Sequence, residues 1–309
     1  MANRCLCCHK PVETNERYHP RCLNRLFDTA RQPQIPFGVA DLPAIVIKAE
    51  GRMSISGVQA KVSIRLDKAT GTIESVATGG THILKPESDR FPLLPQNENL
   101  CMNMAEELGM RVPPHGLFAM SDGKLCYIIK RFDRADDGSK IPNETAFQIL
   151  GPADKYTGSL EQIGKAIRTH AANVGLDTID FFERALFCFL TGNGDMHMKN
   201  WALLGQGKDI AIAPCYDLVS SNIYIENEPD SALTINAKKN KLKRADFEAL
   251  AKNLRIDAKA AANVFDKLER AKETLREMIA NSELRADLRQ ELMSVLGKRY
   301  RRLYEKPEE

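Results

Sequence analysis

The hydrophobic pattern of this 309-residue chain changes near residue 136. Before that point apolar and polar residues alternate, as in 62–66, and turn residues separate the alternating runs, which is typical of hairpins in a half-buried sheet. After it, apolar residues recur at helical spacing through 160–174, 179–190 and most of 245–303. The order of the two patterns predicts an α+β fold, with a sheet-rich lobe followed by a helical lobe.

Composition excludes several classes of protein. Hydrophobic residues make up 43% of the chain and charged residues 28%, which excludes a disordered or fibrous protein. The net charge of +3 gives no strong field for nucleic acid or membrane. The most apolar window, 185–190, is far shorter than the ~20 residues of a membrane span. Without an apolar leader at the start, and with cysteines in apolar surroundings, we expect a cytoplasmic protein with reduced thiols and no membrane contact.

The first part of the chain forms a separate compositional zone. Four of the eight cysteines fall in its first 22 residues, and three prolines in 33–43 indicate a connector. We therefore predict a Cys/His-rich segment and linker over 1–35, a sheet-rich lobe over 36–135 and a helical lobe over 136–309.

The cysteine-rich segment carries a candidate metal site. Cys5 and Cys8, with His19 and Cys22, have the ligand types and spacing of a small tetrahedral zinc site. Cys7 has no role in that interpretation. The alternative is a set of reduced cysteines that pack a short helix at 21–27 against the sheet-rich lobe.

A polar loop over 194–200 follows an apolar helix and precedes a strand-like segment. Asp195 and Asn200 are five positions apart, as are the aspartate and asparagine of a protein-kinase catalytic loop, and Asp217 follows further on. Phosphoryl transfer needs an aspartate that accepts the proton of the attacking hydroxyl, and oxygen ligands for Mg²⁺. The alternative is a helix-to-strand turn that uses Asp and Asn for local hydrogen bonds.

Other parts of a kinase occur upstream in the expected order. A small-residue loop over 54–61 precedes a strand, so its backbone amides could hold phosphates. Lys85 ends a strand and Glu98 opens a helix, which allows a lysine on the phosphates held by a glutamate. The strand that ends at 130–133 lies at the lobe boundary, where an adenine-binding hinge is expected. Each piece alone is typical of an ordinary turn, an exposed lysine or a strand end, but their agreement in order favours a kinase.

Four motifs, at 54–61, 83–86, 130–134 and 195–200 with Tyr216 and Asp217, resemble the HipA-type serine/threonine kinases, toxins of bacterial toxin–antitoxin modules. The resemblance runs from about residue 54 to the C-terminus. It implies a two-lobed protein-kinase-like fold, also related to phosphatidylinositol kinases, that binds ATP between the lobes.

The resemblance also implies roles for individual residues. Asp195 would be the catalytic base, while Asn200 and Asp217 would hold Mg²⁺. The residues implied to bind ATP are Ser56, Gly57, Val58, Gln59, Ala60, Lys61, Lys85, Glu98, Lys130, Arg131, Phe132, Asp133, His197, Lys199 and Tyr216.

The family's loop serine corresponds here to Ser54, whose autophosphorylation would expel the loop from the ATP site and switch the kinase off. Ser56 adds a second hydroxyl where many family members carry a small apolar residue. We therefore expect autophosphorylation at Ser54, Ser56 or both.

Only 53 residues precede Ser54, too few for the small subdomain of long family members. The chain thus resembles the short HipT type, in which a separate small HipS-like protein replaces that subdomain and a helix-turn-helix HipB-like antitoxin binds DNA. Contact with DNA is expected only through the antitoxin. The expected substrate is a serine or threonine of an aminoacyl-tRNA synthetase or another translation component, with growth arrest as the outcome.

Two alternatives stay open. The loop over 194–200 also resembles the catalytic loop of phosphatidylinositol kinases, which would make the protein a lipid or small-molecule kinase. A catalytically silent subunit of a DNA-bound repressor complex would keep the fold without turnover. In addition, 143–148 departs from the family's acidic motif after the hinge, so its role is open.

Overall fold

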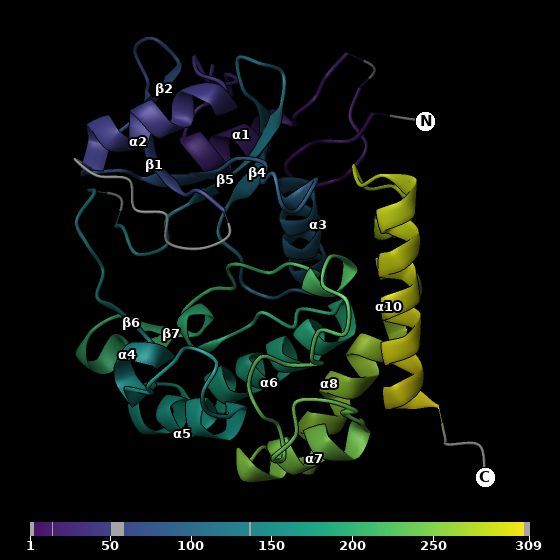
Figure 1. Cartoon of the computed structure of the whole chain (residues 1–309). Helices are drawn as coiled ribbons and strands as arrows, with labels where there is room; N and C mark the ends of the chain where they lie inside the picture. The colour runs from purple at the N-terminus through teal and green to yellow at the C-terminus, as the bar shows by residue number, and fades with distance from the viewer. Residues whose placement is uncertain (1–2, 14, 51–58, 136, 306–309) are drawn as a thin grey trace. The chain divides into compact units, whose positions relative to one another are not determined.

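The computed structural model describes residues 3–13, 15–50, 59–135 and 137–305. The chain forms two compact units (Figure 1). The first comprises Met1–Asn103 and Pro113–Ser139, and the second comprises Met104–Val112 and Lys140–Glu309.

The first unit is built on an antiparallel five-stranded sheet of order β2-β1-β3-β5-β4. Its elements are α1 (Pro20–Phe27), η1 (Val39–Asp41), α2 (Leu42–Glu50), β1 (Val62–Asp67), β2 (Thr72–Ser75), β3 (His82–Lys85), α3 (Leu94–Glu107, whose last turn belongs to the second unit), β4 (His115–Ala119) and β5 (Leu125–Lys130). The hairpins predicted from the alternating pattern are present, with β1 paired to β2 and β4 to β5. Gly123 takes φ +79° in the second turn, a conformation that suits glycine.

The cysteine-rich segment packs onto this sheet as part of the first unit. Its helix α1 begins with Pro20, a position that needs no N–H partner, and lies beside β5 (Figure 1). Tyr18 stacks on Phe118 of β4, with ring centroids 4.9 Å apart, and its hydroxyl donates to the carbonyl of Leu117 at 2.9 Å. The segment therefore contributes to the core of the unit.

The second unit is mostly helical, as predicted. Its elements are β6 (Asn143–Thr145), α4 (Ala146–Leu150), α5 (Leu160–His170), α6 (Val174–Thr191), η2 (Met198–Asn200), β7 (Ala202–Leu204), η3 (Gly207–Asp209), β8 (Ala211–Ile212), η4 (Ser221–Ile223), α7 (Arg244–Asn253), α8 (Ala258–Arg270), α9 (Lys272–Ala280) and α10 (Ala286–Tyr304). The buried helix α6 contacts α5, α7, α8 and α10, the long yellow helix in Figure 1. The strands form a small antiparallel sheet of order β6-β7-β8.

The helix predicted over 160–174 ends earlier than expected. Ala171 has extended backbone, and the side chain of Asn173 accepts from the N–H of Leu176 at 3.3 Å, so α6 begins with its own N-cap. In the described part of the chain, no helix combines the length and apolar character of a membrane span.

The segment 143–148, whose role was open, forms a strand and a helix cap. Thr145 Oγ1 accepts from the N–H of Gln148 at 3.3 Å, and Gln148 Oε1 accepts from the N–H of Thr145 at 2.8 Å. This reciprocal capping box starts α4. The N–H of Ala146 also donates to the carbonyl of Trp201 at 2.7 Å, which ties the segment to the end of the polar loop.

Candidate active site

The polar loop of the second unit is a compact turn at the end of α6. The helix ends at Thr191, and Gly192 caps it with φ +72°. The carbonyl of Asp195 accepts from the N–H of His197 at 2.7 Å, and the carbonyl of His197 accepts from the N–H of Asn200 at 2.9 Å. These bonds close a short turn that brings the two ends of the predicted Asp195–Asn200 motif near each other.

The carboxylate of Asp195 is held by Tyr156, a residue outside every sequence motif. The Tyr156 hydroxyl donates to Asp195 Oδ1 at 2.7 Å, and its ring meets the His197 ring edge-on at 5.3 Å. Burial and the negative charge of Asp195 raise the pKa of Tyr156, so the hydroxyl keeps its proton and remains a donor. Within the described residues, the buried His197 Nδ1 has no hydrogen-bond partner.

Asn200 and Asp217 offer oxygen ligands at the same loop. The buried Asn200 donates from Nδ2 to the carbonyl of Asp195 at 3.3 Å, so its Oδ1 is the atom left to accept or to coordinate. Asp217 takes φ +52°, an uncommon conformation for a residue other than glycine and one found often at functional sites. The neighbouring Tyr216 hydroxyl donates to the carbonyl of Lys199 at 2.9 Å, which ties the Asp217 segment to the loop.

Glu228 is a second carboxyl group near Asp195, and sequence reasoning missed it. Its Oε2 accepts from Ser221 Oγ at 2.8 Å, and Ser221 Oγ accepts from the N–H of Gly194 at 2.9 Å. A Cβ at Gly194 would lie 2.4 Å from Glu228 Cδ, so glycine at this position makes room for the carboxyl group. Burial, aided by the charge of Asp195, raises the pKa of Glu228 to about 7.

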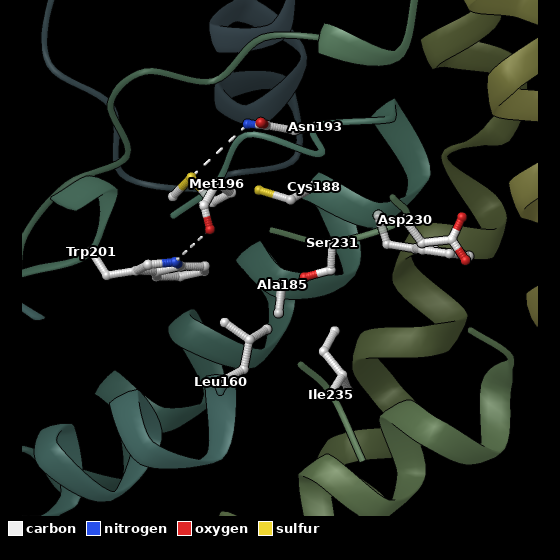
Figure 2. A pocket seen from close by; sticks show the side chains of 10 residues that line it. Leu160, Ala185, Cys188, Asn193, Met196, Trp201, Asp230, Ser231 and Ile235 are labelled. Carbon is white, nitrogen blue, oxygen red and sulfur yellow. Dashed lines mark hydrogen bonds between the residues drawn. The ribbon is translucent and has the colours of Figure 1, made fainter. Parts of the chain in front are cut away.

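A cavity lies behind the loop, as Figure 2 shows. On the loop side it is lined by Asn193, Met196 and Trp201. Trp201 Nε1 donates to the carbonyl of Met196 at 3.4 Å, and Asn193 Nδ2 contacts Met196 Sδ at 3.9 Å (Figure 2). Asp195 and Asn200 do not line this cavity, so it is distinct from the candidate site.

In the first unit, the structure brings together the predicted Lys85 and Glu98. Lys85 Nζ, at the end of β3, lies 2.6 Å from Glu98 Oε1 in α3. Both residues are buried, with 4% and 1% of their surface exposed. Lys85 Nζ also lies 5.7 Å from the ring centroid of Tyr127. The ammonium group is therefore held in one position by a charged partner.

The backbone at the end of β5 is partly committed to the sheet. The N–H of Lys130 donates to the carbonyl of Pro114 at 2.8 Å, and the N–H of Arg131 donates to the carbonyl of Thr81 at 2.9 Å. These two donors cannot also pair with a purine. An adenine hinge on this segment would have to use a donor from Phe132 onward.

The side chains at this strand end pair with one another. Asp133 accepts from Arg131 Nε at 2.8 Å and from Arg134 Nη1 at 2.9 Å. Burial opposes ionisation of Asp133, but these guanidinium groups lower its pKa overall. Lys130 Nζ lies 3.2 Å from Asp28 Oδ1, at the end of α1. The ATP contact that the resemblance implies for Asp133 would therefore share a carboxylate that already binds two arginines.

The small-residue loop is described only in part. Ser54, Ser56, Gly57 and Val58 lie outside the described residues. Gln59 Nε2 donates to the carbonyl of Pro86, directly after Lys85, while Ala60 and Lys61 are exposed.

The predicted cysteine and histidine quartet does come together. One ligand atom from each of Cys5, Cys8, His19 and Cys22 lies within 4.8 Å of the others. The short helix of the alternative interpretation is present as well, since Cys22 lies on α1.

Comparison with known proteins defines the family. Residues 53–276 match the model of the HipA-like C-terminal domain. A protein named Putative kinase Y4dM from Sinorhizobium fredii is 34% identical over 246 residues, covering 72% of this chain and 58% of its own length. A protein named Putative kinase from Haemophilus influenzae is 30% identical over 242 residues, covering 72% of this chain and 70% of its own length. The serine/threonine-protein kinase toxin HipA of Shewanella oneidensis is 27% identical over 63% of this chain and 49% of its own length.

Solved structures agree with this assignment at the level of the fold. The chain is similar to the Shewanella oneidensis toxin–antitoxin complex of HipA, HipB and operator DNA, with a TM-score of 0.68 and 22% identity over 82% of this chain and 65% of the other. It is also similar to the Helicobacter pylori proinflammatory kinase CtkA, with a TM-score of 0.53 and 17% identity over 72% of this chain and 86% of the other.

The fold and the matched region define a kinase-like α+β protein, as predicted. The chain belongs to the HipA-like C-terminal domain family, and the predicted resemblance is confirmed. It spans about 58% of the length of the Sinorhizobium relative.

Proposed function

We propose that this protein is an ATP- and Mg²⁺-dependent serine/threonine kinase of the HipA type. The observation that carries the proposal is the hydrogen bonding of the loop in the second unit. Tyr156 donates to the Asp195 carboxylate, and Asn200 donates to the backbone carbonyl of Asp195. The Asp217 segment is tied to the same loop by the bond from the Tyr216 hydroxyl to the carbonyl of Lys199. The names of the relatives as kinases support it.

Asp195 would act as the general base. Tyr156 occupies one carboxylate oxygen at 2.7 Å and so fixes the orientation of the group. The other oxygen would accept the proton of the substrate hydroxyl as the phosphoryl group is transferred. Because the raised pKa of Tyr156 keeps its proton in place, the tyrosine acts as a positioning residue and not as a competing base.

Asn200 and Asp217 fit a Mg²⁺ site by their chemistry. The Asn200 amide nitrogen is engaged by the loop backbone, which leaves Oδ1 for coordination, and Asp217 supplies a carboxylate. When bound, Mg²⁺ neutralises charge on the phosphate oxygens. On the first unit, the ammonium group of Lys85 would contact phosphate oxygens while Glu98 holds it in place.

The cellular role belongs to the same proposal. The structural neighbour that is in complex with HipB and operator DNA supports a helix-turn-helix antitoxin as partner. We further propose an aminoacyl-tRNA synthetase or another translation component as substrate, regulation by autophosphorylation of Ser54 or Ser56, and a small HipS-like subunit. The eight cysteines all lie among the described residues and form no disulfide there, which is consistent with action in the reducing cytoplasm.

Intact-mass spectrometry tests the proposal. The parent, Asp195→Asn and Asp209→Asn are treated with phosphatase, repurified and incubated with Mg²⁺ and ATP. Asp209 is exposed and lies in the same unit, so its variant controls for loss of a carboxylate. We expect one or more added phosphates on the parent and on Asp209→Asn, localised to Ser54 or Ser56, and none on Asp195→Asn.

Equal phosphate on the parent and on Asp195→Asn would contradict the role of Asp195. If the parent gains no phosphate but consumes ATP when lipids or small alcohols are added, the lipid or small-molecule kinase is favoured. If it neither gains phosphate nor consumes ATP with any acceptor, the silent subunit is favoured.

A further inference from the structure

We propose that Cys5, Cys8, His19 and Cys22 bind a structural zinc ion. Their ligand atoms all lie within 4.8 Å of one another, and Cys8 Sγ lies 3.3 Å from His19 Nδ1. In a tetrahedral site with Zn–S bonds of about 2.3 Å, neighbouring ligand atoms are about 3.5 to 3.8 Å apart. The cluster therefore has nearly the dimensions that a bound zinc ion requires.

The orientation of His19 supports a metal ligand. Its Nε2 lies 3.0 Å from the carbonyl of Pro11, which can only accept, so Nε2 carries the proton. In this tautomer Nδ1 faces Cys8 Sγ at 3.3 Å, as a metal-ligating nitrogen would. Metal-bound histidines characteristically donate their other N–H to a carbonyl or carboxylate in this way.

The backbone around the first two cysteines forms a tight turn. The carbonyl of Cys5 accepts from the N–H of His9 at 2.8 Å, and the N–H of Cys5 donates to the carbonyl of Lys10 at 2.9 Å. The N–H of His19 points at Cys5 Sγ, 3.4 Å away. An N–H aimed at sulfur stabilises a thiolate, which is the form that binds metal.

Cys7 lies outside the quartet and has a packing role instead. A Cβ at Gly116 would lie 2.5 Å from Cys7 Sγ, so Cys7 packs against the glycine of β4. The segment thus contains one packing cysteine among its metal-ligating ones. This arrangement supplies an internal control, because Cys7 has the same chemistry and the same neighbourhood.

The donor set identifies the kind of site. Three thiolates and one imidazole are soft and borderline ligands that favour zinc over Mg²⁺ or Ca²⁺. Four protein ligands complete a tetrahedron and leave no position for water or substrate, as in structural zinc sites. Cys5 and Cys22 are buried and Cys8 and His19 are half-buried, so the ion would be largely shielded from solvent.

Zinc at this position would hold the N-terminal segment on the sheet. Leu6 lies between two ligands, and its carbonyl accepts from the N–H of Leu117 in β4 at 2.9 Å and from Asn99 Nδ2 in α3 at 3.3 Å. Asn99 Oδ1 in turn contacts His115 Nδ1 at 3.0 Å. Since Asn99 directly follows Glu98, loss of zinc is expected to loosen the support of the Lys85–Glu98 pair, a consequence that rests on the proposed kinase function.

Metal analysis of the full chain tests the proposal without reference to kinase activity. The parent, Cys8→Ser and Cys7→Ala are produced in zinc-supplemented medium, and zinc is measured by inductively coupled plasma mass spectrometry. We expect about one zinc per chain in the parent and in Cys7→Ala, and at least a tenfold loss in Cys8→Ser. Cobalt exchanged into the parent is expected to give the intense visible absorption of a tetrahedral thiolate site.

Several results would overturn the site. These are a parent without zinc or a cobalt spectrum, a Cys8→Ser variant that keeps its zinc, or a disulfide among the three cysteines in peptide maps of the unreduced parent. If Cys8→Ser does not fold, the parent itself gives the answer. Chelation is then expected to lower its melting temperature, and zinc, but not magnesium, is expected to restore it; an unchanged melting temperature after complete zinc removal would refute the stabilising role.

Discussion

The buried ion pair in the first unit gives a prediction whose size can be worked out. Glu98→Gln keeps the shape of the side chain, so it creates no cavity and changes mainly the charge. It leaves the Lys85 ammonium group without its charged partner 2.6 Å away, at a position where only 4% of the lysine is exposed. Breaking one side of such a pair costs about 3 to 5 kcal/mol, and we expect a loss in this range.

A double-mutant cycle isolates the charge effect from packing. The cycle compares the double variant Lys85→Met with Glu98→Leu against the single variants Lys85→Met and Glu98→Leu. In the double variant both charges disappear and apolar side chains fill similar space. We expect this double variant to lose only about 0 to 1 kcal/mol, far less than the sum of the single variants. Glu74→Gln is the matched control, since Glu74 pairs with Arg65 at 3.0 Å in the same sheet but the two side chains are 43% and 55% exposed. Its effect should stay below about 1 kcal/mol.

The assay must report on the first unit alone. The single tryptophan, Trp201, belongs to the second unit, so its fluorescence follows the wrong part of the chain. Hydrogen exchange of the amides in β3 and β5 measures the free energy of opening of the sheet that carries Lys85. A loss below about 1 kcal/mol in Glu98→Gln, or additive losses in the double variant, would refute the argument from buried charge.

Three further predictions concern the second unit. Since the pKa of Glu228 is raised to about 7, ionisation of this carboxyl group destabilises the folded state as the pH rises from about 4.5 to above 7. The stability of Glu228→Gln relative to the parent should therefore increase by about 1 to 2 kcal/mol between pH 5 and pH 8. A difference between the two proteins in thermal unfolding that is the same at both pH values would contradict this. Gly194→Ala places a Cβ 2.4 Å from Glu228 Cδ and should cost about 1 to 3 kcal/mol, measured by denaturant unfolding, whereas Gly297→Ala, which meets no atom within 4 Å, should cost nothing. Asp230→Asn weakens the partner of Arg299 and Arg302 and should cost about 3 kcal/mol by tryptophan fluorescence, with no change speaking against a buried charge network.

Local patterns were sufficient for most elements of the fold. Both hairpins of the first unit follow from alternation and turn residues, which are properties of neighbouring positions. The strand β6 and the helix α4 were not predicted from the sequence. β6 forms by pairing with β7, and the residues of the capping box have that role only because α4 begins there. The break after α5 likewise depends on one Asn173 side-chain bond. Such short elements are determined by tertiary contacts more than by their own periodicity.

In the candidate site, too, the sequence indicates the residues that lie close together along the chain and not the distant residues that contact them. The spacing of Asp195 and Asn200 is visible in the sequence because a single turn carries both residues. The hydroxyl that orients Asp195 comes from Tyr156, 39 positions earlier. Nothing in the residues next to Tyr156 in the sequence indicates that contact. Glu228 could not be predicted from the sequence either. Its relation to Gly194 is visible only in the structure, where the missing Cβ of the glycine makes room for the carboxyl group.

The hydrogen bonds of the sheet restrict which backbone groups at the end of β5 can bind a purine. The sequence predicts an adenine-binding hinge where the strand ends at 130–133, at the boundary between the two hydrophobic patterns. The hydrogen bonds of the sheet then occupy the N–H groups of Lys130 and Arg131. Since a backbone N–H makes one strong hydrogen bond, a purine on this segment would have to take its donor from Phe132 or later. Replacing a backbone amide by an ester should therefore weaken ATP binding when it removes a donor after Arg131, and should mainly destabilise the sheet when it removes the donor of Arg131 itself.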